Sequence, residues 1–130
     1  MKILIVDDDR TTRKLLGLFL KRNGFEIQTA ENGLDALEKL GVGGIQLVVT
    51  DLNMPFMDGI EFIRTMKGNP ATADIPALMI TTSTDAEEKR QATAAGVNGY
   101  LCKPVTAEVV AMKIRQMLGE IFRKGGQGIA

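Results

Sequence analysis

The sequence has 130 residues, of which 45% are hydrophobic and 25% are charged, a composition typical of a single globular domain. Its 16 basic and 16 acidic residues cancel, which argues against a chain attracted as a whole to nucleic acid or to an anionic membrane. It contains no histidine, and this excludes Ser-His-Asp and Cys-His catalysis, His-ligated zinc and phosphohistidine chemistry on the chain itself.

The N-terminus and the single cysteine indicate the compartment. The opening residues MKILIV lack the long apolar run and the cleavage site of a signal peptide. No apolar stretch approaches the roughly 18 residues that a membrane span needs. Cys102 cannot form an internal disulfide, and we expect it to be a small core residue rather than a redox thiol. These features predict a cytoplasmic protein without a membrane partner.

Short apolar runs alternate with longer amphipathic segments along the chain. The runs ILIV, LVV and ALMI are continuous, as in parallel strands that are buried on both faces. The segments between them have the apolar spacing of helices, such as Leu15, Leu16, Phe19 and Leu20. We therefore predict a βα unit repeated five times, with strands over residues 2–6, 25–30, 46–50, 77–81 and 99–101.

Glycines and capping residues mark the expected helix boundaries. A glycine in a left-handed conformation commonly follows the last turn of a helix, and the candidates are Gly24, Gly41, Gly68, Gly96 and Gly125. Side chains that accept from free backbone N–H groups begin helices, and the candidates are Asp9, Asp58 with Glu61, Thr84 with Glu87, and Thr106. We expect a folded domain over residues 1–122 and a short flexible tail over residues 123–130.

This order of elements predicts an α/β fold, an open parallel sheet with helices on both faces. Ligands of such sheets bind at the carboxyl ends of the strands. Asp7 and Asp8 follow the first strand, Asp51 follows the third, Thr81 ends the fourth and Lys103 follows the fifth. All five side chains should therefore meet at one edge of the sheet.

Carboxylates crowded at one edge repel each other unless a cation compensates or one of them is protonated. Mg²⁺ is the expected cation, since it prefers oxygen ligands and uses only one or two carboxylates while it keeps water or phosphate in its shell. A site made of Asp7, Asp8 and Asp51 therefore points to a phosphate-bearing partner, with Lys103 as a second positive charge and Asp51 as the nucleophile.

Four motifs together resemble the receiver domain of two-component response regulators, most closely the single-domain receivers of chemotaxis. They are IVDDD, VVTDLNMPFMDG, MITTS and YLCKP, in that order and at strand ends. The resemblance covers about the first 122 residues. It implies the flavodoxin-like, doubly wound form of the sheet, with strand order 2-1-3-4-5 and five helices.

The resemblance assigns roles to the acidic residues. Asp51 would be the phosphoacceptor, and Asp7 and Asp8 the pair that organises Mg²⁺. The backbone carbonyl of Asn53 would be a further metal ligand. The Asn53 side chain and Ser83 would lie where receivers tune their dephosphorylation.

It also assigns roles around the last two strands. Thr81 and Lys103 would hold the phosphoryl group, and the Lys103–Pro104 peptide bond would be cis. Thr81 and Tyr100 would form the switch, in which the Tyr100 rotamer reports phosphorylation on the surface of the fourth helix, fifth strand and fifth helix.

The implied function is a phosphorylation-dependent signalling switch, which is not an enzyme although it promotes its own phosphorylation and dephosphorylation. A sensor histidine kinase or phosphotransfer protein would be the donor. The output would be a downstream protein rather than nucleic acid, because the tail KGGQGIA is too short for an output domain. Two alternatives use the same residues: a Mg²⁺-dependent phosphohydrolase with an aspartyl nucleophile, and a flavodoxin-like binding module.

Overall fold

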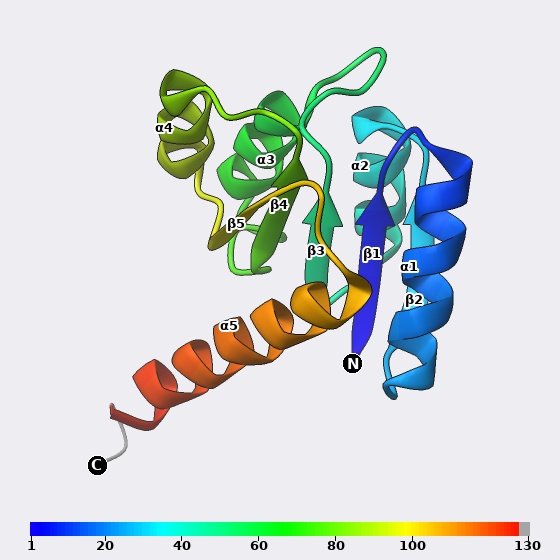
Figure 1. Ribbon diagram of the computed structural model, residues 1–130. Helices are drawn as coiled ribbons and strands as arrows, with labels where there is room; N and C mark the ends of the chain where they lie inside the picture. The colour runs from blue at the N-terminus through cyan, green and yellow to red at the C-terminus, as the bar shows by residue number, and fades with distance from the viewer. Residues whose placement is uncertain (128–130) are drawn as a thin grey trace.

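The computed structural model describes the backbone of residues 1–127 and the side chains of residues 1–120. One five-stranded parallel sheet has the order β2-β1-β3-β4-β5 (Figure 1), so the predicted flavodoxin-like topology is confirmed. The elements are β1 Lys2–Val6, α1 Arg10–Arg22, β2 Glu26–Ala30, α2 Gly33–Val42, β3 Leu47–Thr50, α3 Gly59–Gly68, β4 Ala77–Thr81, α4 Ala86–Ala95, β5 Gly99–Cys102 and α5 Ala107–Gln127.

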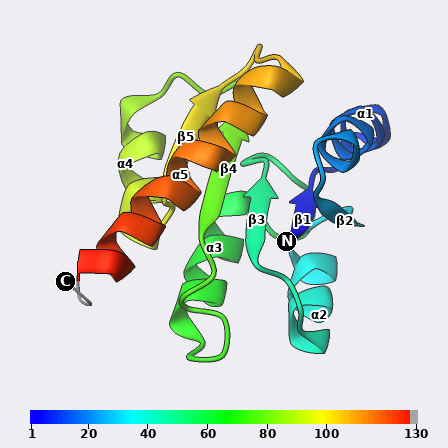
Figure 2. The same cartoon turned by 90° about the horizontal axis from the view of Figure 1, so that it is seen from below.

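The central strands are buried because helices cover both faces of the sheet. Side chains of a strand alternate between its faces, so Leu4 and Val6 of β1 pack in the core with α2, α3 and α4. Ile3 and Ile5 point the other way, into the core with α1 and α5. Figures 1 and 2 show these two helical layers on opposite sides of the sheet. A two-sided core holds the strand ends that carry the site in fixed positions.

The predicted helix starts are largely confirmed. Asp9 and Asp58 are the N-caps of α1 and α3 and accept from Thr12 N at 3.3 Å and from Glu61 N at 2.8 Å. Thr106 likewise accepts from Val109 N at 3.2 Å, at the start of α5. The start predicted at Thr84 is wrong, because Asp85 caps α4 and accepts from Glu87 N at 2.8 Å. A carboxylate is the stronger acceptor for these free N–H groups.

The predicted helix ends are only partly correct. Gly24 and Gly96 have positive φ of 93° and 114° after α1 and α4, as expected. Gly41 and Gly125 lie within α2 and α5, and Gly68 is the last residue of α3 rather than a left-handed residue that follows it. The helix α2 instead ends at Gly43, which has φ 95°. Glycine is tolerated inside a helix at a modest cost, so its presence alone does not locate an end.

The strand predictions differ from the structure by one residue at three boundaries: β2 and β3 start one residue later, and β5 ends one residue later. Part of the expected flexible tail, residues 128–130, lies outside the described residues, and residues 123–127 continue α5. Within the described part of the chain, every helix is too short or too polar to cross a bilayer.

Candidate functional site

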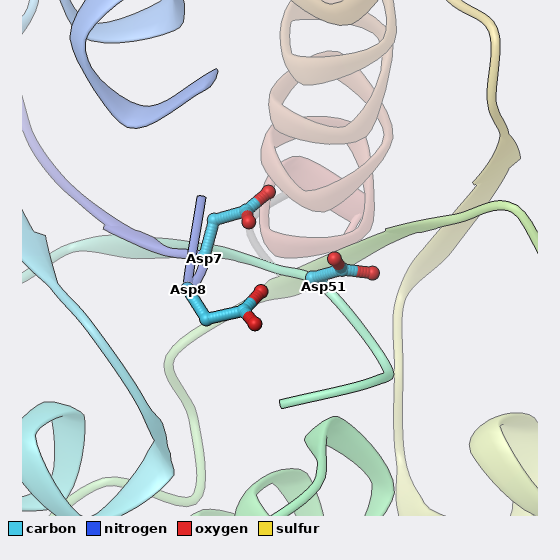
Figure 3. A group of neighbouring side chains, drawn as sticks. All are labelled: Asp7, Asp8 and Asp51. Atoms are coloured by element: carbon cyan, nitrogen blue, oxygen red, sulfur yellow. The ribbon is translucent and has the colours of Figure 1, made fainter. Parts of the chain in front are cut away.

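The carboxyl edge of the sheet brings three aspartates together. The register pairs Val6 of β1 with Thr50 of β3, and Asp51 N donates to Val6 O at 2.9 Å. The residues that follow these strands, Asp7, Asp8 and Asp51, are therefore neighbours. One carboxylate oxygen of each lies within 4.8 Å of the others. Figure 3 shows the Asp7 and Asp8 carboxylates on the side that faces Asp51, so the predicted convergence of the acids is confirmed.

Lys103 joins this acidic cluster from β5, across the sheet. Its Nζ lies 3.3 Å from Asp7 Oδ2 and 3.3 Å from Asp51 Oδ2. The side chains of Asp7 and Asp51 are only 7% and 13% exposed, so these ion pairs are poorly screened by water. Lys103 N donates to Thr81 O at 2.7 Å, and the Lys103–Pro104 peptide bond is cis, as the resemblance implies. The backbone hydrogen bond to Thr81 thus fixes the position of Lys103 beside the end of β4.

Burial and neighbouring charges alter the proton affinity of this site. Burial raises the pKa of Asp7 above its ordinary value, and the nearby Asp51 charge adds to the effect. A hydrogen bond from Asp9 N and the Lys103 charge offset part of it. For Lys103, burial acts against the charged form, but the carboxylates of Asp51 and Asp7 outweigh it and raise the pKa. Lys103 therefore stays protonated and supplies a permanent positive charge.

Arg13 supports the acidic cluster and was not predicted. Its Nη1 donates to the backbone carbonyl of Asp7 at 2.5 Å, while its Nη2 lies 3.9 Å from Glu31 Oε1. Asp9 N donates to Asp7 Oδ1 at 2.9 Å, so the Asp7 carboxylate is oriented from the following turn. Neither contact leaves a sequence signal, since an arginine in the first turns of a helix is common on solvated surfaces.

The loop between β3 and α3 is folded against Asp51. Leu52 N donates to Asp51 Oδ1 at 2.7 Å, and Gly59 N donates to Leu52 O at 2.7 Å. A Cβ at Gly59 would lie 2.1 Å from Asp51 O, so this close approach requires glycine. Asn53 is exposed on this loop. The loop therefore fixes the Asp51 backbone and one of its carboxylate oxygens.

Thr81 and Tyr100 meet through Ser83, in the loop between β4 and α4. Thr81 is fully buried, and its hydroxyl accepts from Ser83 N at 3.1 Å. Ser83 Oγ donates to Glu88 Oε1 of α4 at 2.8 Å. The half-buried Tyr100 donates a long hydrogen bond of 3.5 Å to Ser83 O, and Lys89 Nζ lies 5.6 Å from its ring centre. Ser83 thus links the buried threonine to α4 and to β5.

Cys102 is exposed at the end of β5, so its prediction as a core residue is wrong. Its Sγ lies 3.4 Å from Ser83 O, close to where the Tyr100 hydroxyl donates. The strand β5 is at the edge of the sheet, and the last residue of a short edge strand can face solvent on either side.

An open pocket of about 510 Å³ adjoins the acidic cluster on the side of α1 and α5. Asp7, Asp51 and Lys103 line one part of it, and apolar side chains line the rest, among them Leu15, Leu16, Val105 and Val110. The functional groups are thus accessible from solvent, and a group attached to Asp51 has space beside it.

Comparisons with known proteins agree on one family. A family model described as the response regulator receiver domain matches residues 3–115. Chemotaxis protein CheY-3 of Vibrio cholerae is 41% identical over 125 residues, which are 95% of this chain and 93% of that protein. Chemotaxis protein CheY1 of Helicobacter pylori is 38% identical over 121 residues, 92% and 98% of the two chains.

Solved structures show the same similarity. The chemotaxis protein CheY4 of Vibrio cholerae superposes with a TM-score of 0.85 at 33% identity, covering 89% of this chain and 97% of that one. A CheY-like receiver domain protein of Methanospirillum hungatei gives a TM-score of 0.88 at 26% identity, covering 95% and 97%. Sequence family and fold therefore agree over nearly the whole chain.

Proposed function

This chain belongs to the response regulator receiver family, and on that premise we propose that it is a phosphorylation-dependent signalling switch. A sensor histidine kinase or phosphotransfer protein would donate a phosphoryl group to Asp51, and the altered surface would bind a downstream protein. The observation that carries the proposal is the position of Asp51, which lies beside the carboxylates of Asp7 and Asp8 and 3.3 Å from the Lys103 ammonium group. A carboxylate nucleophile there faces an open pocket rather than the core.

The transfer is a displacement at phosphorus. An oxygen of Asp51 attacks the phosphoryl group, the P–N bond to the donor histidine breaks, and the released imidazole takes up a proton from water. Oxygen Oδ1 of Asp51 accepts from Leu52 N, which leaves Oδ2, now in contact with Lys103, as the attacking atom. The Lys103 charge would stabilise the negative charge on the phosphoryl oxygens.

The acidic residues fit a divalent cation. Asp7, Asp8 and Asp51 offer hard oxygen donors within 4.8 Å of one another, and the backbone carbonyl of Asn53 would complete the protein ligands of Mg²⁺. When bound, Mg²⁺ would neutralise negative charge on the phosphoryl group. The Arg13 and Asp9 contacts to Asp7 would hold the ligands in place.

The response of the surface would begin at Thr81. Its hydroxyl, now bonded to Ser83 N, would instead donate to a phosphoryl oxygen, and Tyr100 would turn inward. The altered face would be that of α4, β5 and α5, and the downstream partner a protein in the cytoplasm rather than nucleic acid or membrane. The chain would also promote its own phosphorylation and dephosphorylation without turning over a substrate, unlike an enzyme.

Intact mass measurement tests this function. With Mg²⁺ and acetyl phosphate, the mass should increase by one phosphoryl group, and Asp51→Asn should abolish the increase. Thr50→Ser changes the adjacent buried residue and serves as a matched control that should still be modified. Modification of a serine or threonine, or steady hydrolysis of small phosphate esters, would contradict the proposal.

A further inference from the structure

Phe56, in the loop between β3 and α3, has a strained backbone. Its φ is 70°, which makes it the single non-glycine residue with positive φ among the described residues. Met57 N donates to Pro55 O at 2.8 Å across it. A positive φ under such an i to i+2 hydrogen bond is the γ-turn that is rare and strained. A bulky aromatic residue is unfavourable at a positive φ, which glycine adopts freely and asparagine adopts more often than other residues do.

The Phe56 side chain also adds nothing to the core. It is 83% exposed, although aromatic side chains dominate the packing energy of cores and interfaces when they are buried. Its neighbours Met54 and Met57 pack against the core that contains α2 and α3. Strain without a packing gain in the fold indicates a role outside the fold.

The loop that carries Phe56 starts at Asp51 and closes back onto it at Gly59. The phenylalanine lies five residues after Asp51, and Gly59 N anchors the far end of the loop to Leu52 O at 2.7 Å. Met57 also fixes the loop against α2, because a Cβ at Gly33 would lie 2.9 Å from the Met57 side chain. In Figure 1 this loop extends beyond the carboxyl edge of the sheet. Rigid, exposed aromatic residues are typical anchors of protein interfaces.

The surface next to the loop is acidic. A polar hollow of about 300 Å³ is lined by Asn53 and by the carboxylates of Asp58, Glu61 and Glu88, with Arg64 as the basic residue among its lining. A partner with an apolar pocket for Phe56 and basic side chains for this hollow would therefore be complementary in shape and charge.

We propose that Phe56 is an anchor for the protein phosphodonor, which binds it in an apolar pocket flanked by basic residues. This inference rests on the proposed function. A donor must bring its phosphohistidine to Asp51. It therefore has to cover the carboxyl edge of the sheet, beyond which the loop with Phe56 extends (Figure 1). A downstream target has no such requirement. Phe56 would then determine which phosphohistidine proteins serve this chain, without taking part in the chemistry.

The test compares a small phosphodonor with protein donors. The probes are acetyl phosphate and each autophosphorylated histidine kinase or phosphotransfer protein of the source organism, and the donor that transfers fastest to the unaltered chain is kept. Phe56→Asn should accept phosphoryl from acetyl phosphate within about twofold of the normal rate. Its transfer from the protein donor should fall about tenfold or more at subsaturating concentration, through KM rather than kcat. Phe56→Tyr should restore the transfer.

Val42→Ala is the matched control, because Val42 is 85% exposed at the C-terminal end of α2, before β3 begins, whereas Asp51 follows the other end of β3. It should leave both rates unchanged. Normal transfer from the protein donor to Phe56→Asn would overturn the inference, as would a defect confined to binding of a downstream target. If acetyl phosphate and every protein donor fail to modify Asp51 of the unaltered chain, the proposed function itself is wrong.

Discussion

Asp7 is the most constrained acid of the site at the scale of single residues. It is buried, its carbonyl accepts from Arg13, and its carboxylate accepts from Asp9 N and contacts Lys103. Its position after an apolar strand predicted its place in the site. Its support by Arg13 could not be predicted, because that contact joins a side chain to a backbone carbonyl six residues earlier and so needs no particular residue type there.

Removal of both acids that follow β1 should abolish the metal site. Asp7→Ala combined with Asp8→Ala should weaken Mg²⁺ binding by at least about 100-fold, since each lost carboxylate removes an attraction of a few kcal/mol or more at an effective dielectric constant of about 20. Asp9→Ala is the control, because it removes an exposed capping carboxylate but keeps the backbone N–H that donates to Asp7. It should lower the melting temperature slightly while Mg²⁺ affinity stays normal. Calorimetric titration measures the Mg²⁺ affinity of the two variants. Unchanged affinity in the double variant would refute the site.

Lys103 should contribute to phosphoryl transfer but not to metal binding. Lys103→Ala removes an ammonium group that lies 3.3 Å from both Asp7 and Asp51, so Mg²⁺ affinity should stay equal or rise. The rate of phosphorylation by acetyl phosphate should fall by about 100-fold, as is usual when one stabilising donor is lost. Lys89→Ala, which removes an exposed lysine of α4, should keep the normal rate. A Lys103 variant with normal phosphorylation and signalling would exclude the residue from the mechanism.

At the scale of elements, the apolar pattern of a whole segment predicted the bounds of an element better than single residues did. The strand segments were correct within one residue because continuous apolar runs are long enough to identify buried strands. Helix ends were less predictable, because Gly41 and Gly125 are accommodated inside helices. A further contact left no signal: Lys67 Nζ, at the end of α3, donates to Ile75 O at 2.7 Å, just before β4.

The junction of β3 and α3 should not tolerate a methyl group at Gly59. Its Cβ would lie 2.1 Å from Asp51 O and 2.9 Å from Leu52 Cα, and backbone atoms cannot move aside as a flexible side chain can. Gly59→Ala should therefore lower the free energy of unfolding by about 1–3 kcal/mol and slow phosphorylation of Asp51, because the loop is pushed away. Urea denaturation and the acetyl phosphate reaction measure the two effects.

Gly41→Ala is the control for that substitution. Gly41 lies within α2, and a Cβ there meets nothing within 4 Å. Alanine should raise the stability by about 0.5–1 kcal/mol through helix propensity. Equal stability of the two variants would show that the contact between Gly59 and Asp51 is not tight.

At the scale of the whole molecule, the topology brings distant segments to one edge of the sheet. The order β2-β1-β3-β4-β5 places β3 between β1 and β4, so the acids, Thr81 and Lys103 come from strands on both sides of Asp51. The convergence at one edge was predicted from the parallel sheet with right-handed connections, and the strand order from the resemblance to receiver domains. The link through Ser83 could not be predicted, because it depends on the conformation of the loop between β4 and α4.

That link supports a two-state response. Ser83 bonds Thr81 through its N–H, Glu88 through its hydroxyl and Tyr100 through its carbonyl. If Thr81 moves to a phosphoryl oxygen, the Ser83 N–H loses its acceptor, and α4 and Tyr100 are released together. Phosphorylation and partner binding then favour the same state and must enhance each other by the same factor.

Thr81→Ala should separate phosphorylation from this response. The variant should still accept phosphoryl on Asp51, because Lys103 and the acids are retained, but the enhancement of partner affinity should fall from a usual 5- to 150-fold range to about twofold or less. The partner is the protein retained by the beryllofluoride-activated chain but not by the unactivated chain, and its affinity is measured for both forms. Thr65→Ala, which removes an exposed hydroxyl bonded to Glu61 O at 2.9 Å, is the matched control and should keep the full enhancement.

Crystal structures with and without beryllofluoride would show how Thr81 and Tyr100 move on activation. In the activated form, Thr81 Oγ1 should lie within hydrogen-bond distance of the beryllofluoride, Ser83 N should have lost its bond to Thr81, and Tyr100 should be turned inward and no longer donate to Ser83 O. The inward rotamer fills the space that Thr81 vacates, so the two movements should occur together or not at all. If Tyr100 keeps one rotamer in both forms and Thr81→Ala retains the full enhancement, the signal leaves Asp51 by another route, even with Asp51 as the acceptor.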